Sequence, residues 1–200
     1  MTQVVLATHN RHKVEELRRI LAPYDVKLAS LEDFPDVPEV AETGATFADN
    51  ALLKARAVAT ATGLVAVADD SGLAVDALNG MPGVLSARWA GRHGDDEANL
   101  QLVLAQVADM PDERRGAAFV CAAAAATPEG SEVVVEGRLE GSLTRAPRGS
   151  NGFGYDPIFL PAGGERTTAE LDPHDKDAIS HRGRAFRELA PLLATLLQRS

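Results

Sequence analysis

The feature that most constrains the fold of this chain is a recurring order of short apolar segment, polar turn and helix. Val4 to Ala7 leads into Thr8-His9-Asn10, after which apolar residues recur at helical spacing from Val14 to Leu21. Leu64 to Ala68 likewise leads into Asp69-Asp70-Ser71-Gly72. Apolar runs of this length are typical of buried strands, and the spacing after the first turn indicates an amphipathic helix. Strands that alternate with helices predict an α/β fold.

The middle of the chain adds paired strands to this pattern. Two strand-like runs, Ala117 to Thr127 and Glu132 to Leu139, flank Thr127-Pro128-Glu129-Gly130, which predicts a hairpin turn. Thr46-Phe47-Ala48-Asp49 is similar to a capping box and predicts a helix that ends at Gly63. The other expected elements are a strand over 26–29, helices over 95–107 and 182–197, and loops over 31–44 and 145–155. We therefore expect one layered α/β domain over residues 1–200 with a mixed sheet.

The charge balance limits the partners of this chain. It has 20 basic and 29 acidic residues among 200, which gives a formal net charge of −9. Such a chain lacks the positive field that a nucleic-acid polymer or an anionic membrane attracts. No apolar run reaches the ~18 residues that span a bilayer, no secretory signal is visible, and the single Cys121 cannot form an internal disulfide. We expect a cytoplasmic protein that binds neither nucleic-acid polymers nor membranes.

The first polar cluster joins a strand to a helix and consists of Thr8, His9, Asn10, Arg11, His12 and Lys13. Free N–H groups and the positive end of a helix favour a phosphate at such a place. An N-capping turn with a solvated basic residue explains the same residues equally well, and His12 has no partner pattern of its own.

The second cluster, Asp69-Asp70-Ser71-Gly72, follows a strand of apolar residues only. Adjacent side chains on a strand point to opposite faces, so both carboxylates reach one pocket only if the chain turns there, as Gly72 permits. Mg²⁺ takes one or two carboxylates together with substrate phosphates, and Glu42 could supply a ligand from a second segment. A polar β-turn with solvated aspartates is the alternative.

Two further clusters lie near the carboxyl end. Phe153 and Tyr155 stand among glycines in a chain with few aromatic residues, which favours a surface that stacks on a flat base, although two core aromatics pinning a turn have the same spacing. Lys176 and His181-Arg182 precede the last helix, where they could hold phosphate oxygens or donate to a base carbonyl, or form a solvated face. The motifs of P-loop NTPases, α/β-hydrolases and zinc peptidases are absent.

Taken in order, these clusters resemble the inosine triphosphate pyrophosphatase family. The resemblance covers almost the whole chain. It is carried by Val4 to Asn10 with Lys13, Glu42-Thr43-Gly44 through Asn50-Ala51, Leu53-Lys54-Ala55, Asp69 to Leu73, Gly83 with Ser86-Ala87-Arg88, Gly152 to Phe159 and Ala178 to Gly183. The chain departs from the family pattern at His9, where relatives usually have a small residue, and at Ala41, where some have a second acid before Glu42.

The resemblance implies a fold and a set of roles. The fold would be two-lobed, around a long curved mixed sheet with the nucleotide in the cleft between the lobes, and the assembly a homodimer. Glu42, Asp69 and Asp70 would hold Mg²⁺, and Asp70 would be the base that deprotonates the attacking water. The residues expected to bind the nucleotide are Thr8 to Lys13, Lys54 and Ser71, then Phe153, Gly154, Tyr155, Asp156, Lys176, His181 and Arg182, the last two and the aromatic loop near the base.

The implied reaction is the hydrolysis of ITP, dITP and XTP to the monophosphate and pyrophosphate, which cleanses the nucleotide pool. A triphosphate brings nearly four negative charges to an acidic protein, so Lys, Arg and Mg²⁺ must neutralise it locally. Two other hypotheses stay open from the sequence. One is a nucleotide-binding module without turnover, and the other is a phosphatase or pyrophosphatase for different nucleotides, such as modified pyrimidines.

Overall fold

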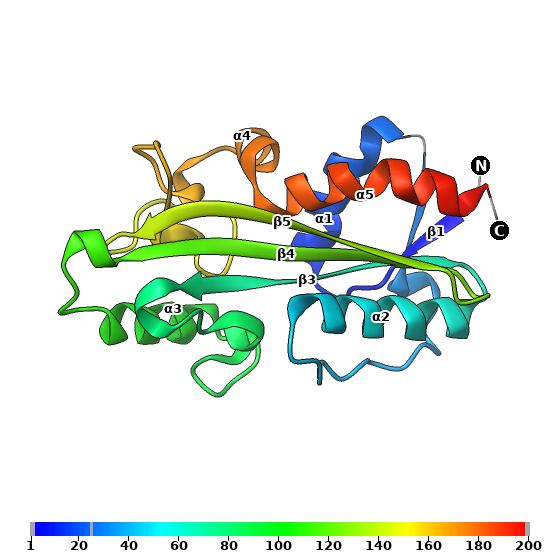
Figure 1. Cartoon of the computed structure of the whole chain (residues 1–200), viewed down its shortest axis with the longest axis horizontal. Helices are drawn as coiled ribbons and strands as arrows, with labels where there is room; N and C mark the ends of the chain where they lie inside the picture. The colour runs from blue at the N-terminus through cyan, green and yellow to red at the C-terminus, as the bar shows by residue number, and fades with distance from the viewer. Residues whose placement is uncertain (1–2, 25, 199–200) are drawn as a thin grey trace. The chain divides into compact units, whose positions relative to one another are not determined.

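The structure is a computed structural model that describes residues 3–24 and 26–198. Its strands are β1 (Gln3–Leu6), β2 (Lys27–Ser30), β3 (Val65–Val75), β4 (Gly116–Ala126), β5 (Glu132–Leu143) and β6 (Phe159–Pro161). Its α-helices are α1 (Arg11–Leu21), α2 (Phe47–Thr62), α3 (Asp96–Gln106), α4 (Pro173–Ile179) and α5 (His181–Leu197). Short 3-10 turns connect several of them (Figure 1).

The strands form a six-stranded sheet in the order β2-β1-β3-β4-β5-β6. β1 pairs in parallel with both β2 and β3, whereas β5 and β6 are antiparallel. The predicted α/β class with a mixed sheet is therefore confirmed. The register places Leu6, the last residue of β1, beside Val67, so β3 continues past the end of β1 and carries Asp69 and Asp70 there. Ligands in sheets of this kind bind beyond the carboxyl ends of the strands.

The chain divides into two compact units, and the single domain expected over 1–200 stays a prediction. The first unit takes the described residues of 1–70, 121–137 and 182–200, and the second takes 71–120 and 138–181. β3, β4 and β5 each contribute residues to both units.

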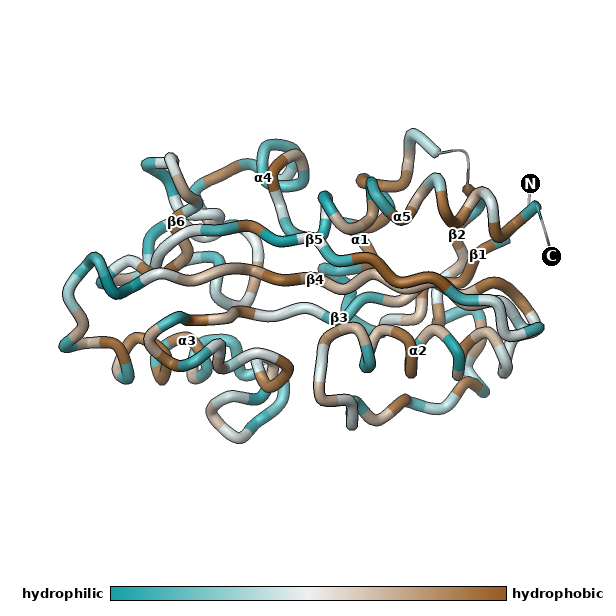
Figure 2. Tube along the Cα trace, viewed as in Figure 1, coloured by the Kyte–Doolittle hydropathy of each residue, from teal (hydrophilic) through white to brown (hydrophobic). Residues whose placement is uncertain are grey.

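In the first unit, helices cover both faces of the sheet. Apolar residues of α1 and α5, such as Leu17 and Phe186, pack with Val65 and Val67 of β3. The alternate residues of the same strand, including Ala66, pack with the alanine-rich side of α2 instead. α2 begins in a capping box between Thr46 and Asp49, as predicted. Figure 2 shows the hydrophobic character of the central strands that these two layers enclose.

The second unit has a core of its own. Leu73 and Val75 of β3 pack there with Leu100 and Val103 of α3, and with Phe159. Arg115 is buried among them and donates hydrogen bonds to the carbonyl oxygens of Val107, Leu143 and Thr144 at 2.6, 3.0 and 2.8 Å. The guanidinium thus joins the end of α3 to the end of β5.

Three elements of the structure differ from what the sequence predicted. The strand expected to end at Ala68 continues through Asp69 and Asp70 to Val75, because both carboxylates are buried and paired with side chains instead of turning into solvent. β5 extends to Leu143, beyond the expected Leu139. The short helix α4 was not expected at all; its N-cap Asp172 accepts a hydrogen bond from the Asp175 N–H.

Two further expectations are confirmed within the described residues. The alanine-rich run before the hairpin is strand β4, and Cys121 is a buried core residue of it. No described helix has the length and apolar character needed to cross a membrane.

We predict that Arg115→Met destabilises the protein by about 2 to 4 kcal/mol, because it keeps the aliphatic stem but removes all three hydrogen bonds that the guanidinium donates to carbonyl oxygens. Urea denaturation measures the change. The neighbouring, exposed Arg114→Met is the matched control and should leave the free energy of unfolding within about 0.5 kcal/mol of the wild type. Equal stability of the two variants would contradict the role given to Arg115.

Candidate active site

The turn between β1 and α1 is built by local hydrogen bonds. The Thr8 hydroxyl accepts from the Asn10 N–H at 3.2 Å, and the Asn10 side chain, the N-cap of α1, accepts from the Lys13 N–H at 3.2 Å. The N-capping turn is thus observed. It also sends the half-buried Lys13 side chain toward β3, where its ammonium lies 3.0 Å from Asp69 Oδ2.

Asp69 and Asp70 face opposite sides of β3, because the strand does not turn between them. Asp69 points to the side covered by α1 and α5, where it also accepts from Arg182 Nε at 3.2 Å. Asp70 points to the side covered by α2 and accepts from Asn50 Nδ2 at 3.0 Å. Adjacent aspartates therefore have entirely different partners.

Lys54 joins Asp70 to the acidic loop before α2. Its ammonium lies 2.7 Å from Glu42 Oε1 and 3.4 Å from Asp70 Oδ1, and only 13% of the side chain is exposed. Two carboxylates from separate segments thus share one cation. Lys54 reaches this place because it lies one helical turn after Asn50, on the side of α2 that faces β3.

The environment moves the pKa values of the two aspartates in opposite directions. Burial by itself would raise the pKa of Asp69, but the Lys13 ammonium and the Arg182 guanidinium outweigh burial and hold this pKa well below its usual range. Burial raises the pKa of Asp70 above its usual value, and the Glu42 carboxylate adds to the rise although Lys54 opposes it. Asp70 is therefore the more basic carboxylate of the two.

The expected three-carboxylate metal site is not assembled in the structure. Over residues 3–24 and 26–198, no three acidic, histidine or cysteine side chains are placed to hold one metal ion. Asp69 lies on the other face of β3 from Asp70. Glu42 and Asp70 do fit a metal, because their oxygens already face one common cation and Mg²⁺ takes one or two carboxylates with water and phosphate as its other ligands.

Asn50 is a site residue to which the sequence reasoning gave no role. It is fully buried, donates to Asp70, and accepts a hydrogen bond from the Gly44 N–H at 2.7 Å. One side chain thus fixes both Asp70 and the loop that carries Glu42. The signal was present in the sequence, since Asn50 and Lys54 are four residues apart on a predicted helix and so share a face.

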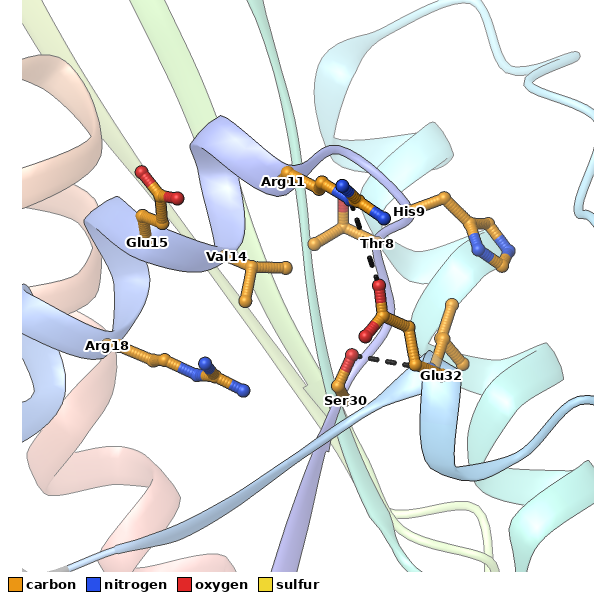
Figure 3. A pocket seen from close by; sticks show the side chains of 9 residues that line it. Thr8, His9, Arg11, Val14, Glu15, Arg18, Ser30 and Glu32 are labelled. Carbon is orange, nitrogen blue, oxygen red and sulfur yellow. Dashed lines mark hydrogen bonds and ion pairs between the residues drawn. The ribbon is translucent and has the colours of Figure 1, made fainter.

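A pocket of about 260 Å³ lies next to the β1–α1 turn and is lined by residues of that turn and of α1 and by residues 30–32 (Figure 3). Arg11 lines it and forms an exposed ion pair with Glu32, with 3.9 Å between Nε and Oε1. The His9 ring points away from this pair in Figure 3. Arg11 and Lys13 therefore have different surroundings, and contacts of Arg11, His9 or the exposed His12 with phosphate stay predictions.

In the second unit, Asp156 is the centre of the glycine-rich aromatic loop. Its Oδ2 accepts from Lys176 Nζ at 2.6 Å and from the Phe153 N–H at 2.9 Å, and its Oδ1 accepts from the Thr168 hydroxyl at 2.8 Å. Lys176 Nζ also lies 5.1 Å from the centre of the Phe153 ring, within the range of a cation–π contact. The structure thus brings together Phe153, Asp156 and Lys176 from two predicted clusters.

The rest of this loop is held by residues that the sequence left without a function. The Tyr155 hydroxyl donates to the Ser86 carbonyl oxygen at 2.8 Å, and the Gly154 N–H donates to Asp96 Oδ2 at 2.9 Å. Gly154 has a φ of +61°, a conformation that favours glycine. Tyr155 is a buried core residue, whereas Phe153 is half-buried, so Phe153 is the more exposed of the two aromatic rings.

His181 and Arg182 have separate surroundings although they are adjacent. His181 belongs to the second unit and stacks on Phe119, with ring centres 4.8 Å apart. Arg182 belongs to the first unit, is 2% exposed and is bonded to Asp69 and to Glu16 of α1. The structure shows Arg182 in an ion-pair network, and its contact with a base stays a prediction, as does that of the half-buried Ser71.

Comparison with known proteins shows the family of this chain. The sequence profile of the Ham1 family matches residues 4–192. The chain belongs to the Ham1 family. It is 62% identical over 201 residues to a Streptomyces coelicolor protein named dITP/XTP pyrophosphatase, covering 98% of this chain and 100% of that protein. A Mycobacteroides abscessus protein of the same name is 63% identical over 198 residues, covering 98% of this chain and 96% of that protein.

Solved structures of relatives have the same fold. A Mycobacterium abscessus nucleoside-triphosphatase, also titled dITP/XTP pyrophosphatase, aligns with a TM-score of 0.78 at 64% identity over 95% of this chain and 100% of its own. A Coxiella burnetii HAM1 protein aligns with a TM-score of 0.88 at 44% identity over 98% of this chain and 100% of its own. The resemblance drawn from the sequence motifs is thus confirmed.

We predict opposite effects of two neighbouring substitutions on stability. Asp69→Asn removes a buried charge from two cations and should cost about 3 to 5 kcal/mol. Asp70→Asn should leave stability equal or raise it by less than about 2 kcal/mol, because a folded-state pKa above the unfolded value means that the ionised carboxylate lowers stability at neutral pH. Urea denaturation at pH 7 compares them, and a larger loss for Asp70→Asn would contradict the assignment.

Proposed function

We propose that this protein hydrolyses non-canonical purine nucleoside triphosphates, namely dITP, XTP and ITP, to the nucleoside monophosphate and pyrophosphate. The observation that carries the proposal is the set of two carboxylates and one lysine, Glu42, Asp70 and Lys54, joined at one place. Hydrolysis of a triphosphate needs a base for water and positive charge for the phosphates, and this set offers both. The name dITP/XTP pyrophosphatase, borne by relatives more than 60% identical, gives the substrate class.

Asp70 is the proposed general base. Its raised pKa makes it a better proton acceptor than an ordinary aspartate at neutral pH. The Asn50 hydrogen bond to Oδ2 fixes the carboxylate while Oδ1 faces Lys54, so the orientation of Asp70 is set before substrate arrives. Water attacks phosphorus, its proton passes to Asp70, and pyrophosphate leaves with the bonding electron pair.

Positive charge comes from lysines and from a divalent cation. Lys13 and Lys54 reach Asp69 and Asp70 of β3 from two different helices and are the proposed phosphate contacts. Glu42 and Asp70 are the residues that would hold Mg²⁺, which supplies charge neutralisation to the triphosphate when bound. Asp69 is not part of this set, because its carboxylate faces the opposite side of β3 from Asp70.

Base recognition is proposed for the aromatic loop with Lys176 and His181. Hypoxanthine and xanthine carry a carbonyl oxygen at position 6 where adenine carries an amino group, so a donor from this unit favours the former. A lost hydrogen bond in a dry site costs about 1 to 3 kcal/mol, which is tenfold or more in selectivity. Assembly as a homodimer, a cytoplasmic location and a role in cleansing the nucleotide pool belong to the same proposal.

A product assay tests the reaction. We expect pyrophosphate from ITP, dITP and XTP in the presence of Mg²⁺, at kcat/KM at least about tenfold above that for ATP, GTP or dTTP, as one lost hydrogen bond requires. Chelation with EDTA should abolish turnover. Orthophosphate as the first product would contradict the proposal, and preference for a pyrimidine would favour the alternative substrate class.

Replacement of the base tests the mechanism. Asp70→Asn should lower kcat for ITP by about 100-fold or more, because proton transfer by a positioned side chain contributes at least this much. Isothermal titration should still detect ITP binding, which separates loss of chemistry from loss of the site. Asp109→Asn, at an exposed position of the second unit, is the control and should keep normal kcat. Normal turnover by Asp70→Asn would remove Asp70 as the base.

A further inference from the structure

The position of Lys54 affects how a divalent metal ion binds to Glu42 and Asp70. This inference rests on the proposed function. Its ammonium contacts Glu42 Oε1 at 2.7 Å and Asp70 Oδ1 at 3.4 Å. These are oxygens that a shared divalent cation would also need. Lys54 therefore acts as an internal counter-ion for the two carboxylates.

The charges of the three groups interact strongly, because their side chains are largely shielded from water. The exposed fractions of the side chains are 13% for Lys54, 22% for Glu42 and 7% for Asp70, so water screens their charges poorly. The second oxygen of Asp70 is engaged by Asn50. A doubly charged ion placed between Glu42 and Asp70 would meet the ammonium at close range, and like charges at such a distance repel strongly.

The ammonium consequently has to leave when the metal binds, and it then needs another anion. An ammonium without an anionic partner would cost free energy there, because only a small part of the Lys54 side chain reaches solvent. The triphosphate supplies that anion. Metal binding and nucleotide binding thereby become coupled, and coupling of two ligands is reciprocal.

We propose that Lys54 competes with Mg²⁺ for Glu42 and Asp70, so that the metal binds together with the nucleotide and only weakly to the nucleotide-free protein. The species recognised is then the metal–triphosphate complex. Lys54 has two successive partners: the carboxylates before substrate binds, and phosphate oxygens afterwards.

The test is Mg²⁺ binding to the whole protein in the absence of nucleotide, measured by isothermal titration. Lys54→Met and Lys54→Gln should bind Mg²⁺ at least about tenfold more tightly than the wild type, since a competing charge has been removed. Lys54→Arg retains the charge and should bind Mg²⁺ as weakly as the wild type. Lys54→Met and Lys54→Gln should also bind ITP more weakly than the wild type, because a phosphate contact is lost.

Two controls locate the effect. Arg56→Met removes a cation from the same helix that pairs with Glu132 on the surface, and it should leave Mg²⁺ affinity within about twofold of the wild type. Glu42→Gln added to Lys54→Met should reverse the gain, because one of the two contested carboxylates is gone. Circular dichroism confirms that each variant is folded, and the Gln variant replaces the Met variant should the latter unfold.

The outcomes separate this inference from the proposed function. Equal Mg²⁺ affinity of the wild type, Lys54→Met and Lys54→Gln, in a wild type that releases pyrophosphate from ITP, overturns the competition and leaves the pyrophosphatase in place. A wild type that releases no pyrophosphate overturns the proposed function whatever the Mg²⁺ affinities are. Tighter binding in both charge-removing variants, with Arg56→Met unchanged, supports the competition.

Discussion

The buried carboxylate of Asp69 links strand β3 to helices α1 and α5 in the first unit. It receives Lys13 from α1 and Arg182 from α5, and Arg182 in turn contacts Glu16 of α1. Two positive and two negative side chains thus close a network beneath two helices and a strand. Such buried charges are tolerated only when each has a partner of opposite sign, and each of the four has one here. The network also gives Lys13, the proposed phosphate contact, a fixed position before any nucleotide binds.

The two faces of β3 carry aspartates with different roles, one structural and the other in the proposed chemistry. Asp69 faces the helices that stabilise the unit, and Asp70 faces Asn50 and Lys54, where the proposed chemistry takes place. Because side chains alternate along a strand, consecutive aspartates can have independent environments and opposite pKa shifts. A turn after Asp69, which the sequence allowed, would have placed both in one environment and removed this separation.

The second unit holds the loop proposed for base recognition by a different means. Here the loop around Phe153 is held mainly through its backbone and through Asp156, which accepts from Lys176, Thr168 and the Phe153 N–H. Asp96 and Ser86, from a part of the chain to which no chemistry was assigned, complete the support. A glycine-rich loop needs such ties, because glycine has the most conformational freedom to lose when the loop becomes ordered.

Local sequence determined the order of the elements and the residues at their ends. The capping box at Thr46, the turn at Thr8-His9-Asn10 and the alternation of strand and helix are all set by contacts within a few residues, so they were predictable. The partners of buried charges were not predictable in this way, because Arg182 and Asp69 are 113 residues apart and Asn50 and Asp70 are 20 apart. Only the packing of α1, α2 and α5 on opposite faces of β3 decided that Asp69 stabilises the unit, that Asp70 joins Glu42 through Lys54, and that Arg182 is buried. The alternation of side chains along a strand predicts that Asp69 and Asp70 point in opposite directions. Only the tertiary structure determines which residues each of them contacts.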